Sequence, residues 1–331
     1  MRRRTFIAML GGAIALTPRL TKAHQPDRAR RISVIMAIGS DDPLRKIYTE
    51  ALMEGLRSAD WVEGRNITMD YRWADGSAER AKTLAKDIVA SGPDVIIAHT
   101  TPVTSALVSE TTAIPIIFVT VTEPVTQGFA RSDARPGGNL TGFSNFEFSM
   151  GSKWLQILKE IAPGTTQVAV LFNPDTAPGR GEIFLRSVEV NAASLGIMIS
   201  PAPVRDPAGI EAAIGTVSKK AHPGLIVPPD IFLTVNRATI IRSAEEQRVP
   251  TIYQYDYFTR SGGLVSYGAD VPDLFRRAAA YVDRVLKGAK VGDLPVQAPT
   301  KFQLTVNLRA ARTLGLSIPE SLLLRCDEVI E

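Results

Sequence analysis

RISVIMAIGSDDPLRKIYTEALMEGLRSA, residues 31–59, decides the fold class. Its first part, Arg31–Ile38, is a short apolar run typical of a buried strand. In Pro43–Ala59 the apolar side chains recur at the three- and four-residue spacing of a helix with one buried face. A buried strand followed by such a helix is the repeating unit of a parallel sheet covered by helices. We therefore expect an α/β protein.

The strand–helix unit repeats in both halves of the chain. In the first half we expect further strands at 66–73, 94–98 and 116–120 and helices at 78–91 and 101–111. In the second half we expect strands at 167–172, 197–201, 224–227, 251–253, 263–267 and 301–307, and helices at 154–161, 181–195, 207–221, 234–247, 270–286 and 308–314. Two successive sets of this kind predict two Rossmann-like lobes, each with a parallel sheet.

The joint between the lobes is expected near Pro136–Asn145, where glycines and polar residues interrupt the periodicity. We expect the first lobe to hold residues 24–144 with about 268–292, and the second to hold 145–267 with about 293–331. The last segments then cross back between the lobes, which predicts a hinge several strands wide.

Residues 1–23 have the three parts of an export signal: a cationic start, an apolar stretch from Phe6 to Leu16, and the small residue Ala23 before a polar one. The stretch is shorter than the about 20 apolar residues that a membrane span needs, and nothing later reaches that length. Arg3-Arg4 resembles the core of a twin-arginine signal, so the Tat and Sec routes both remain open. We expect a mature chain in the periplasm that does not span the membrane.

The net charge of +4 comes from this leader. Residues 1–23 hold five basic side chains and no acidic one, which leaves 33 basic and 34 acidic residues in the remainder. A neutral body has no electrostatic footprint for a polyanion, so we expect no nucleic-acid partner.

Features of catalysis are few. The sequence has no HExxH, GxSxG or P-loop motif, and no GxGxxG follows the first predicted strand. Cys326 is the single cysteine, which rules out an internal disulfide. His99 ends a predicted strand, but a histidine without an identified partner is more often structural. We expect no catalytic residue, no metal site and no cofactor.

Ligands of open α/β sheets bind beyond the carboxyl ends of the strands, beside helix N-termini. The loops at these positions carry hydroxyls, amides, carboxylates and rings. The candidate ligand-binding residues are Ser40, Trp73, Thr100, Thr101, Thr122, Glu123, Asn173, Asp230, Tyr255 and Asp256. Ser40, Thr101 and Asp230 are equally suited to cap the helices that follow them.

An amino-acid ligand would divide these candidates by chemistry. Its carboxylate needs N–H groups and hydroxyls at a helix N-terminus, for which the candidates are Ser40, Thr100 and Thr101. Its ammonium group needs a carboxylate, for which they are Glu123, Asp230 and Asp256. A flat side chain would pack on Trp73 or Tyr255. Asn145, Tyr267 and Asp270 are expected in the hinge.

Four long segments resemble one protein family. They are the leader MRRRTFIAMLGG, ITMDYRWADGSAER (67–80), PGGNLTGFSNFEFSMGSKWLQILKEIAP (136–163) and the tail 262–331, which begins GGLVSYGADVPDLFRRAAAYVDRVLKG. The family is that of the ABC-transporter substrate-binding proteins that include the tryptophan- and tyrosine-binding lipoproteins. The resemblance covers essentially the whole chain.

The resemblance implies a type I periplasmic binding fold, with two α/β lobes, three crossing strands and a ligand enclosed at the hinge. It also implies an extracytoplasmic subunit that captures a small polar or aromatic metabolite, such as an amino acid. We expect this subunit to be a monomer. The partner would be an ABC permease with a separate ATPase subunit. Unlike the lipoprotein members, this chain has no Cys after the apolar stretch, so we expect no lipid anchor.

Two other functions remain open. A ligand-sensing periplasmic receptor for a signalling system would use the same binding chemistry. An exported α/β enzyme would use the same layers, but it needs an acid–base pair that the sequence does not mark. A two-lobed transcription regulator would carry a helix-turn-helix before the first lobe, where only the leader lies.

Overall fold

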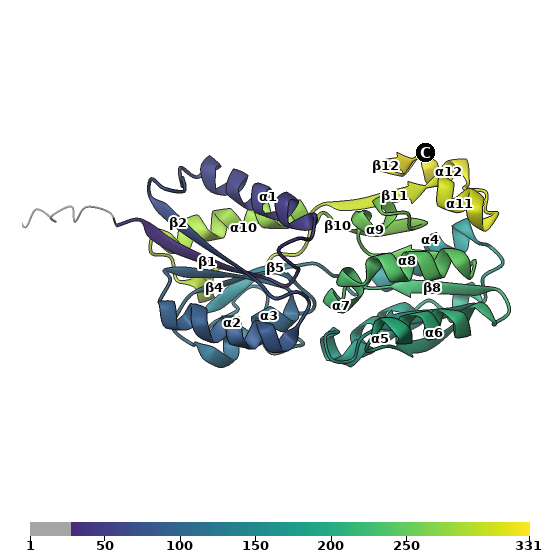
Figure 1. The fold of residues 1–331 in the computed structure, drawn as a ribbon, viewed down its shortest axis with the longest axis horizontal. Coiled ribbons are helices and arrows are strands. Elements are labelled where there is room, and N and C mark those ends of the chain that lie inside the picture. The colour runs from purple at the N-terminus through teal and green to yellow at the C-terminus, as the bar shows by residue number, and fades with distance from the viewer. Residues whose placement is uncertain (1–27) are drawn as a thin grey trace, which may run out of the picture.

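The structure is a computed structural model that describes residues 28–331. Two α/β lobes lie side by side, each with a central sheet and helices on both faces (Figure 1). The predicted fold class, with two lobes and predominantly parallel sheets, is confirmed. The predicted signal peptide, residues 1–23, and its cleavage point after Ala23 lie outside the described residues.

The first lobe is built on a five-stranded parallel sheet in the order β2-β1-β3-β4-β5. Its strands are β1 (Arg30–Met36), β2 (Ile67–Trp73), β3 (Val95–His99), β4 (Ile116–Val121) and β5 (Leu140–Ser144). Every residue of β3, β4 and β5 is buried, because helices cover both faces of the sheet. These helices are α1 (Leu44–Ser58) with α10 (Val271–Leu286) on one face, and α2 (Ala78–Ser91) with α3 (Thr101–Glu110) on the other (Figure 1).

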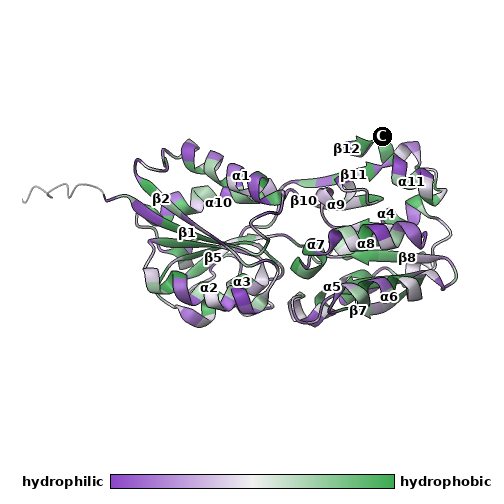
Figure 2. Ribbon diagram, viewed as in Figure 1, coloured by the Kyte–Doolittle hydropathy of each residue, from purple (hydrophilic) through white to green (hydrophobic). Residues whose placement is uncertain are grey.

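The second lobe has a seven-stranded sheet in the order β12-β11-β10-β9-β8-β6-β7, parallel except between β10 and β11. Its strands are β6 (Gln167–Phe172), β7 (Met198–Pro203), β8 (Pro223–Val227), β9 (Thr251–Tyr253), β10 (Val265–Ala269), β11 (Phe302–Asn307) and β12 (Glu328–Ile330). Its helices are α4 (Met150–Ile161), α5 (Glu182–Glu189), α6 (Pro207–Ser218), α7 (Ile231–Val235), α8 (Arg237–Glu246), α9 (Asp256–Arg260), α11 (Leu308–Leu314) and α12 (Glu320–Leu323). In both lobes the inner strands are hydrophobic, whereas the helices show hydrophilic residues (Figure 2).

The chain passes between the lobes three times. It runs from β5 to α4 through residues 145–149, returns from β10 to α10 at Asp270, and leaves again before β11. The Gln297 N–H donates to the Gly142 carbonyl of β5 (2.9 Å), so the chain is still beside the first sheet at that point. The lobe limits drawn from the sequence stay a prediction, and this contact favours a return to the second lobe a few residues later than about 293.

One strand lies where the sequence predicted a joint. Leu140–Ser144 pairs with β4 as the edge strand of the first sheet, although a glycine interrupts its apolar pattern. A Cβ on Gly142 would lie only 2.0 Å from the Phe118 carbonyl oxygen, so glycine is required for this close approach. The pairing, and not the local periodicity, makes this segment a strand.

Two predicted helices are interrupted. The segment 181–195 contains α5 between two short 3₁₀ turns, Pro178–Gly181 and Ala193–Leu195. The segment 234–247 divides at Asn236, whose side-chain amide donates to the Phe232 carbonyl (2.8 Å). The short elements α9, α12 and β12 were not predicted, because three to five residues are too few to display a period.

Candidate ligand-binding site

A pocket lies between the lobes at the carboxyl ends of their parallel strands. The first lobe supplies residues that follow β1, β3 and β4, together with Tyr48 of α1. The second lobe supplies residues from the loops after β6, β8 and β9. Asn145, on the first crossing segment, and Val271, at the start of α10, complete the wall. The pocket is therefore complete only when both lobes meet.

The N-terminus of α3 forms a polar part of this wall. Thr100 precedes the helix with φ 76° and ψ 163°, a region that is almost restricted to glycine, and Thr120 also has a positive φ of 62°. The Thr100 hydroxyl is buried, and no described residue hydrogen-bonds to it. Backbone strain and an unpaired polar group thus occur in the same wall of the pocket. Such combinations are characteristic of functional sites.

Asp230 forms the opposite polar wall, in the second lobe. Its Oδ1 accepts hydrogen bonds from the Thr176 hydroxyl (2.5 Å) and the Phe232 N–H (2.9 Å), and its Oδ2 accepts one from the Asn173 N–H (2.8 Å). The side chain is buried, and this burial raises the pKa of Asp230 to about 6. Within residues 28–331, no basic side chain forms an ion pair with it. The pocket therefore contains a buried carboxyl group without a cationic partner.

Aromatic rings line the pocket on the side of α1 and α9. The rings of Tyr255 and Tyr257 stack with centroids 5.2 Å apart, and Tyr48 stacks on Phe275 of α10 at 5.0 Å. Burial raises the pKa of all three tyrosines above its usual value, which keeps their hydroxyls protonated. This side of the pocket suits a flat or apolar group.

Asn145 connects the two lobes from within the crossing segment. Its Oδ1 accepts a hydrogen bond from the Thr122 hydroxyl of the first lobe (2.9 Å). Its Nδ2 donates to the Tyr255 hydroxyl of the second lobe (2.7 Å), and its carbonyl accepts from Gln254 Nε2 (3.1 Å). One hinge residue therefore positions pocket side chains from both lobes.

His99 ends β3 and lies in the aromatic part of the wall. Its Nδ1 accepts the Ala37 N–H (3.3 Å), and its ring packs against both Tyr48 (5.6 Å) and Phe275 (5.5 Å), which stack on each other. Burial lowers the pKa of His99 to about 3, so the imidazole is neutral at physiological pH.

An ion pair joins the lobes beside the pocket. Arg237, the first residue of α8, donates to Asp42 Oδ2 (2.8 Å) and Oδ1 (3.1 Å), and also to the Thr234 carbonyl (3.0 Å). The two charged side chains are only 18% and 10% exposed. The guanidinium also lies over the Tyr257 ring, at 6.0 Å from its centroid.

The structure brings half of the sequence candidates together. The candidates that line the pocket are Thr100, Thr101, Thr122, Asp230 and Tyr255. The candidates that lie off its wall are Ser40, Trp73, Glu123, Asn173 and Asp256. The first five come from both lobes and carry the polar and aromatic groups described above.

The five candidates off the wall have other neighbours. Ser40 is exposed, and Trp73 stacks on Tyr71 (6.1 Å) at the edge of the first sheet. Asn173 accepts the Asp175 N–H through its side chain and supports Asp230 through its own N–H. Asp256 pairs with Arg260 in α9 (3.1 Å), and Glu123 contacts the Thr126 hydroxyl (3.3 Å). A loop position after a strand was thus not sufficient to identify the residues that line the pocket.

Other pocket residues were not chosen from the sequence. They are Ile38, Tyr48, His99, Pro102, Thr120, Asn145, Thr176, Pro178, Pro229, Ile231, Thr234, Tyr257 and Val271. His99 and Thr120 stand at the ends of predicted strands, which was a usable signal. Tyr48 is on the buried face of α1 and had no such signal, because its spacing alone indicates core.

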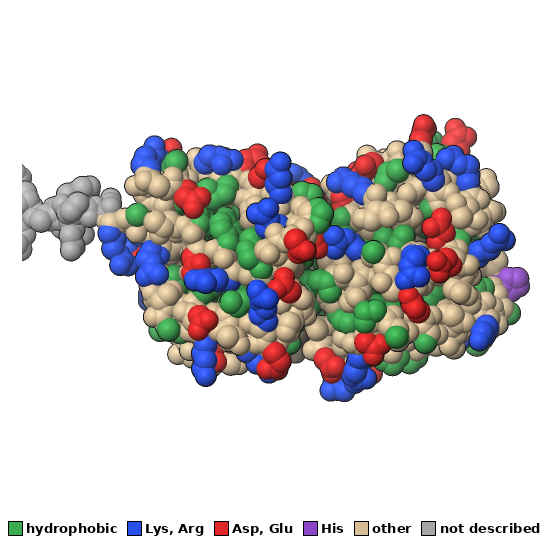
Figure 3. Space-filling model, viewed as in Figure 1, with side chains coloured by type: hydrophobic (Ala, Val, Ile, Leu, Met, Phe, Trp, Pro, Cys, Tyr) green, Lys and Arg blue, Asp and Glu red, His purple; other side chains and the backbone are tan. Residues whose placement is uncertain are grey.

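Among the residues described, no group of three or more His, Cys, Asp or Glu side chains is arranged to hold a metal ion. No helix in residues 28–331 is both long and apolar enough to cross a membrane. Acidic and basic side chains are interspersed over the face shown in Figure 3, with no large area of one sign.

The chain has the two-lobed fold of the type I periplasmic binding proteins, with a pocket between its lobes. Residues 31–330 match the family described as ABC transporter substrate binding protein, and the chain belongs to this family. Proteins of this family and fold bind substrates and are not enzymes. The resemblance that the sequence indicated is confirmed.

Known relatives agree with this assignment. A tyrosine-binding protein of Clostridioides difficile is 27% identical over 285 residues, which cover 86% of this chain and 80% of that protein. A crystal structure of a conserved domain protein from Vibrio cholerae is 27% identical, with a TM-score of 0.84 over 91% of this chain and 100% of the other. A Streptococcus pneumoniae domain in complex with L-Trp is 23% identical, with the same TM-score and coverage.

Proposed function

We propose that this protein captures an aromatic amino acid between its lobes and delivers it to an ABC permease. The observation that carries the proposal is a pair of polar groups on the pocket wall, one from each lobe. The first lobe presents an unpaired hydroxyl at a helix N-terminus, and the second presents a buried carboxyl group without a cation. An α-amino acid supplies a complementary carboxylate and ammonium group a short distance apart.

The carboxylate is assigned to the N-terminus of α3. The first N–H groups of a helix have no partner within it, and the helix dipole favours a negative charge there. Thr100 adds its buried hydroxyl, and Thr101 lies beside it on the pocket wall. A bound carboxylate would give the Thr100 hydroxyl the partner that it lacks.

The ammonium group is assigned to Asp230. Three donors already hold this carboxyl group in place, so it needs little reorganisation when a ligand arrives. A cation bound beside it would favour the ionised form and offset the cost of burying that charge. Asp230 therefore acts in this proposal both as the cap of α7 and as a ligand contact.

The side chain of the ligand is assigned to the aromatic part of the wall. The rings of Tyr48, Tyr255 and Tyr257 line the same pocket, and in this proposal they receive the side chain of a ligand held at α3 and Asp230. Stacking of aromatic rings contributes about 0.5–1.5 kcal/mol beyond burial. The tyrosine-binding and tryptophan-bound relatives support a ligand of this class.

Binding would work by population shift. A ligand that contacts both lobes stabilises the closed arrangement by its differential affinity for it. We propose further that residues 1–23 direct export to the periplasm, by the Tat or the Sec route, and that the closed monomer delivers its ligand to a permease with a separate ATPase subunit.

Binding to matched analogues tests this proposal. Residues 24–331 would be titrated calorimetrically with tyrosine, tryptophan and phenylalanine, with tyramine (no carboxylate), and with N-acetyltyrosine (no ammonium group). We expect binding of the aromatic amino acids and a loss of at least about 100-fold in affinity for each analogue, because each leaves one buried polar group unpaired. Equal affinity for tyramine and tyrosine would contradict the role of α3, and equal affinity for N-acetyltyrosine would contradict that of Asp230.

A further inference from the structure

His99 has one nitrogen without an assigned role. The ring is buried, with 5% of the residue exposed, and it lies on the pocket wall. Nδ1 accepts the Ala37 N–H at 3.3 Å, and among residues 28–331 nothing accepts a hydrogen bond from Nε2. The packing against Tyr48 and Phe275 fixes the plane of the ring.

The bond to Ala37 also determines the tautomer. A nitrogen that accepts a hydrogen bond carries no proton, so in the neutral ring the proton is on Nε2. Burial lowers the pKa of His99 to about 3, and the ring therefore stays neutral at physiological pH. His99 can act toward a ligand only as an N–H donor.

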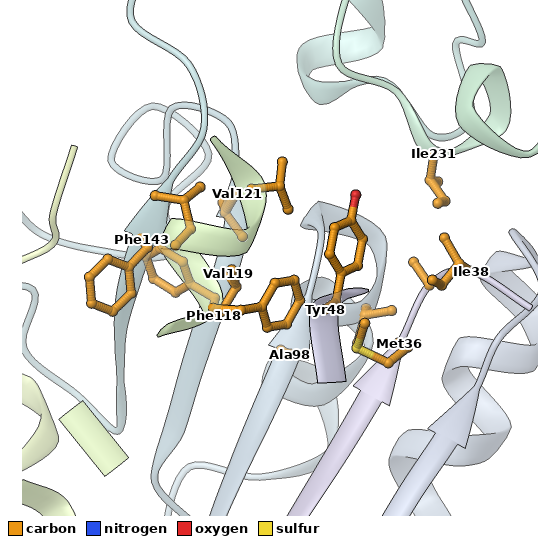
Figure 4. Close-up of a cluster of buried hydrophobic side chains, with 14 of the residues drawn as sticks. Met36, Ile38, Tyr48, Ala98, Phe118, Val119, Val121, Phe143 and Ile231 are labelled. Atoms are coloured by element: carbon orange, nitrogen blue, oxygen red, sulfur yellow. The ribbon is translucent and has the colours of Figure 1, made fainter. Parts of the chain in front are cut away.

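His99 belongs to the aromatic part of the wall. Its ring packs against α1 and α10, on the opposite face of the first sheet from α3. The Tyr48 hydroxyl extends from the same side, and in Figure 4 it points away from the buried side chains of the sheet, with Ile38 and Ile231 facing each other to one side of its ring. No hydrogen bond to the Tyr48 hydroxyl is found within the described part of the chain.

We propose that His99 donates its Nε2–H to the far end of the ligand side chain and so selects a phenol over a plain phenyl or an indole ring. This inference rests on the proposed function and names the substrate class more narrowly, as an amino acid with a hydroxylated aromatic side chain. A phenol group accepts the hydrogen bond from His99 through its oxygen and donates its own O–H to the Tyr48 hydroxyl oxygen. Phenylalanine has no polar group there. The indole N–H of tryptophan is a donor only, so it cannot accept the hydrogen bond from His99 and leaves the Nε2–H unpaired.

Two histidine substitutions separate this role from a structural one. In H99N the amide oxygen replaces Nδ1 as acceptor for Ala37, but the distant donor is lost. In H99Q the amide nitrogen takes the place of Nε2 as donor, but the acceptor for Ala37 is lost. A structural histidine tolerates the first change better, and a ligand-binding histidine tolerates the second.

The experiment measures dissociation constants of the full chain without its leader for tyrosine, phenylalanine and tryptophan. We expect wild type to prefer tyrosine over phenylalanine by about tenfold or more, as expected for one well-placed hydrogen bond. We expect H99N to abolish this ratio while its affinity for phenylalanine changes less than about twofold. H99Q should retain the ratio while its melting temperature falls. H222N, at an exposed histidine of the second lobe, is the matched control and should change nothing.

The outcomes distinguish this inference from the proposed function. Wild type that binds all three amino acids without preference, or H99N that keeps the tyrosine preference, overturns the role of His99 and leaves the proposed function standing. Wild type that binds none of the three overturns both. The Nε2 resonance of His99 in an ¹⁵N spectrum gives a second readout, because tyrosine and not phenylalanine should shift it.

Discussion

Breaking the Arg237–Asp42 ion pair should weaken ligand binding, because this contact joins the two lobes. The pair connects α8 of the second lobe with the segment before α1 of the first, through two hydrogen bonds of 2.8 and 3.1 Å. Its members lie in different lobes, so the contact exists only while the lobes are together. In D42N the Arg237 guanidinium loses a charged partner in the closed state and remains hydrated in the open state.

The size of the effect follows from the burial of the pair. Exposed ion pairs contribute about 0.2–1 kcal/mol, whereas breaking a buried pair costs about 3–5 kcal/mol. With side chains 18% and 10% exposed in this structure, and charges that become hydrated when the lobes separate, an intermediate value of about 1.5–3 kcal/mol applies. If the protein without ligand is mostly open, this full amount appears in binding. The dissociation constant should rise about 10- to 150-fold.

The assay is a double-mutant cycle with D42N, R237Q and the double variant, measured by calorimetry and by stopped-flow dissociation. We expect the increase to appear mainly in the dissociation rate, because most differences between related complexes lie there. R242Q is the control: Arg242 also lies on α8, but it pairs with Glu211 within the second lobe, and both side chains are about half exposed. A coupling energy below about 0.3 kcal/mol, or an equal effect in R242Q, would refute the reasoning.

Two further predictions concern stability. Burial raises the pKa of Asp230 from 3.8 to about 6, so the folded chain without ligand binds a proton more tightly than the unfolded chain. The free energy of unfolding should therefore fall by about 3 kcal/mol as the pH rises from below 4 to above 6. Urea titrations across this range should show that D230N lacks this part of the pH dependence, and parallel curves for the two proteins would contradict it. G268A should destabilise the protein by about 3 kcal/mol, because its Cβ would lie 1.9 Å from the Gln254 carbonyl oxygen in the second lobe. The control G215A, in α6 with open space around it, should be neutral or slightly stabilising in the same urea titration, and an equal loss in both variants would show that crowding at Gln254 is not the cause.

Periodicity predicted the elements that generate their own signal. The buried strands and amphipathic helices of the first 120 residues were found within one or two residues of their limits, because burial on one or both faces dictates where apolar side chains stand. β5 was not predicted, because its strand character comes from pairing with β4. Its glycine is required by the close approach to Phe118. The break between α7 and α8 at Asn236 was also not predicted, because the apolar residues around it continue a helical pattern across the break.

The candidate residues of the site also divide into those that the sequence could predict and those that it could not. Rules on strand ends and helix N-termini led to Thr100, Thr101 and Asp230, whose positions depend on backbone topology. The same rules also selected Trp73 and Asp256, because topology does not determine in which direction a loop side chain points. Tyr48 was not selected as a candidate for the opposite reason. A residue on the buried face of a helix resembles a core residue until the second lobe is placed against it.

The distribution of unsatisfied groups explains why closure and binding would be one event. The Thr100 hydroxyl and the His99 Nε2–H belong to the first lobe, and Asp230 belongs to the second. In the open form water can reach these groups, so leaving them without protein partners costs little there. In this structure the Thr100 hydroxyl is buried without a partner and the Asp230 carboxyl group is buried without a cation, so the empty pocket incurs the cost of desolvating both. A ligand that pairs these groups removes this cost only in the closed form, which is the differential affinity that population shift requires.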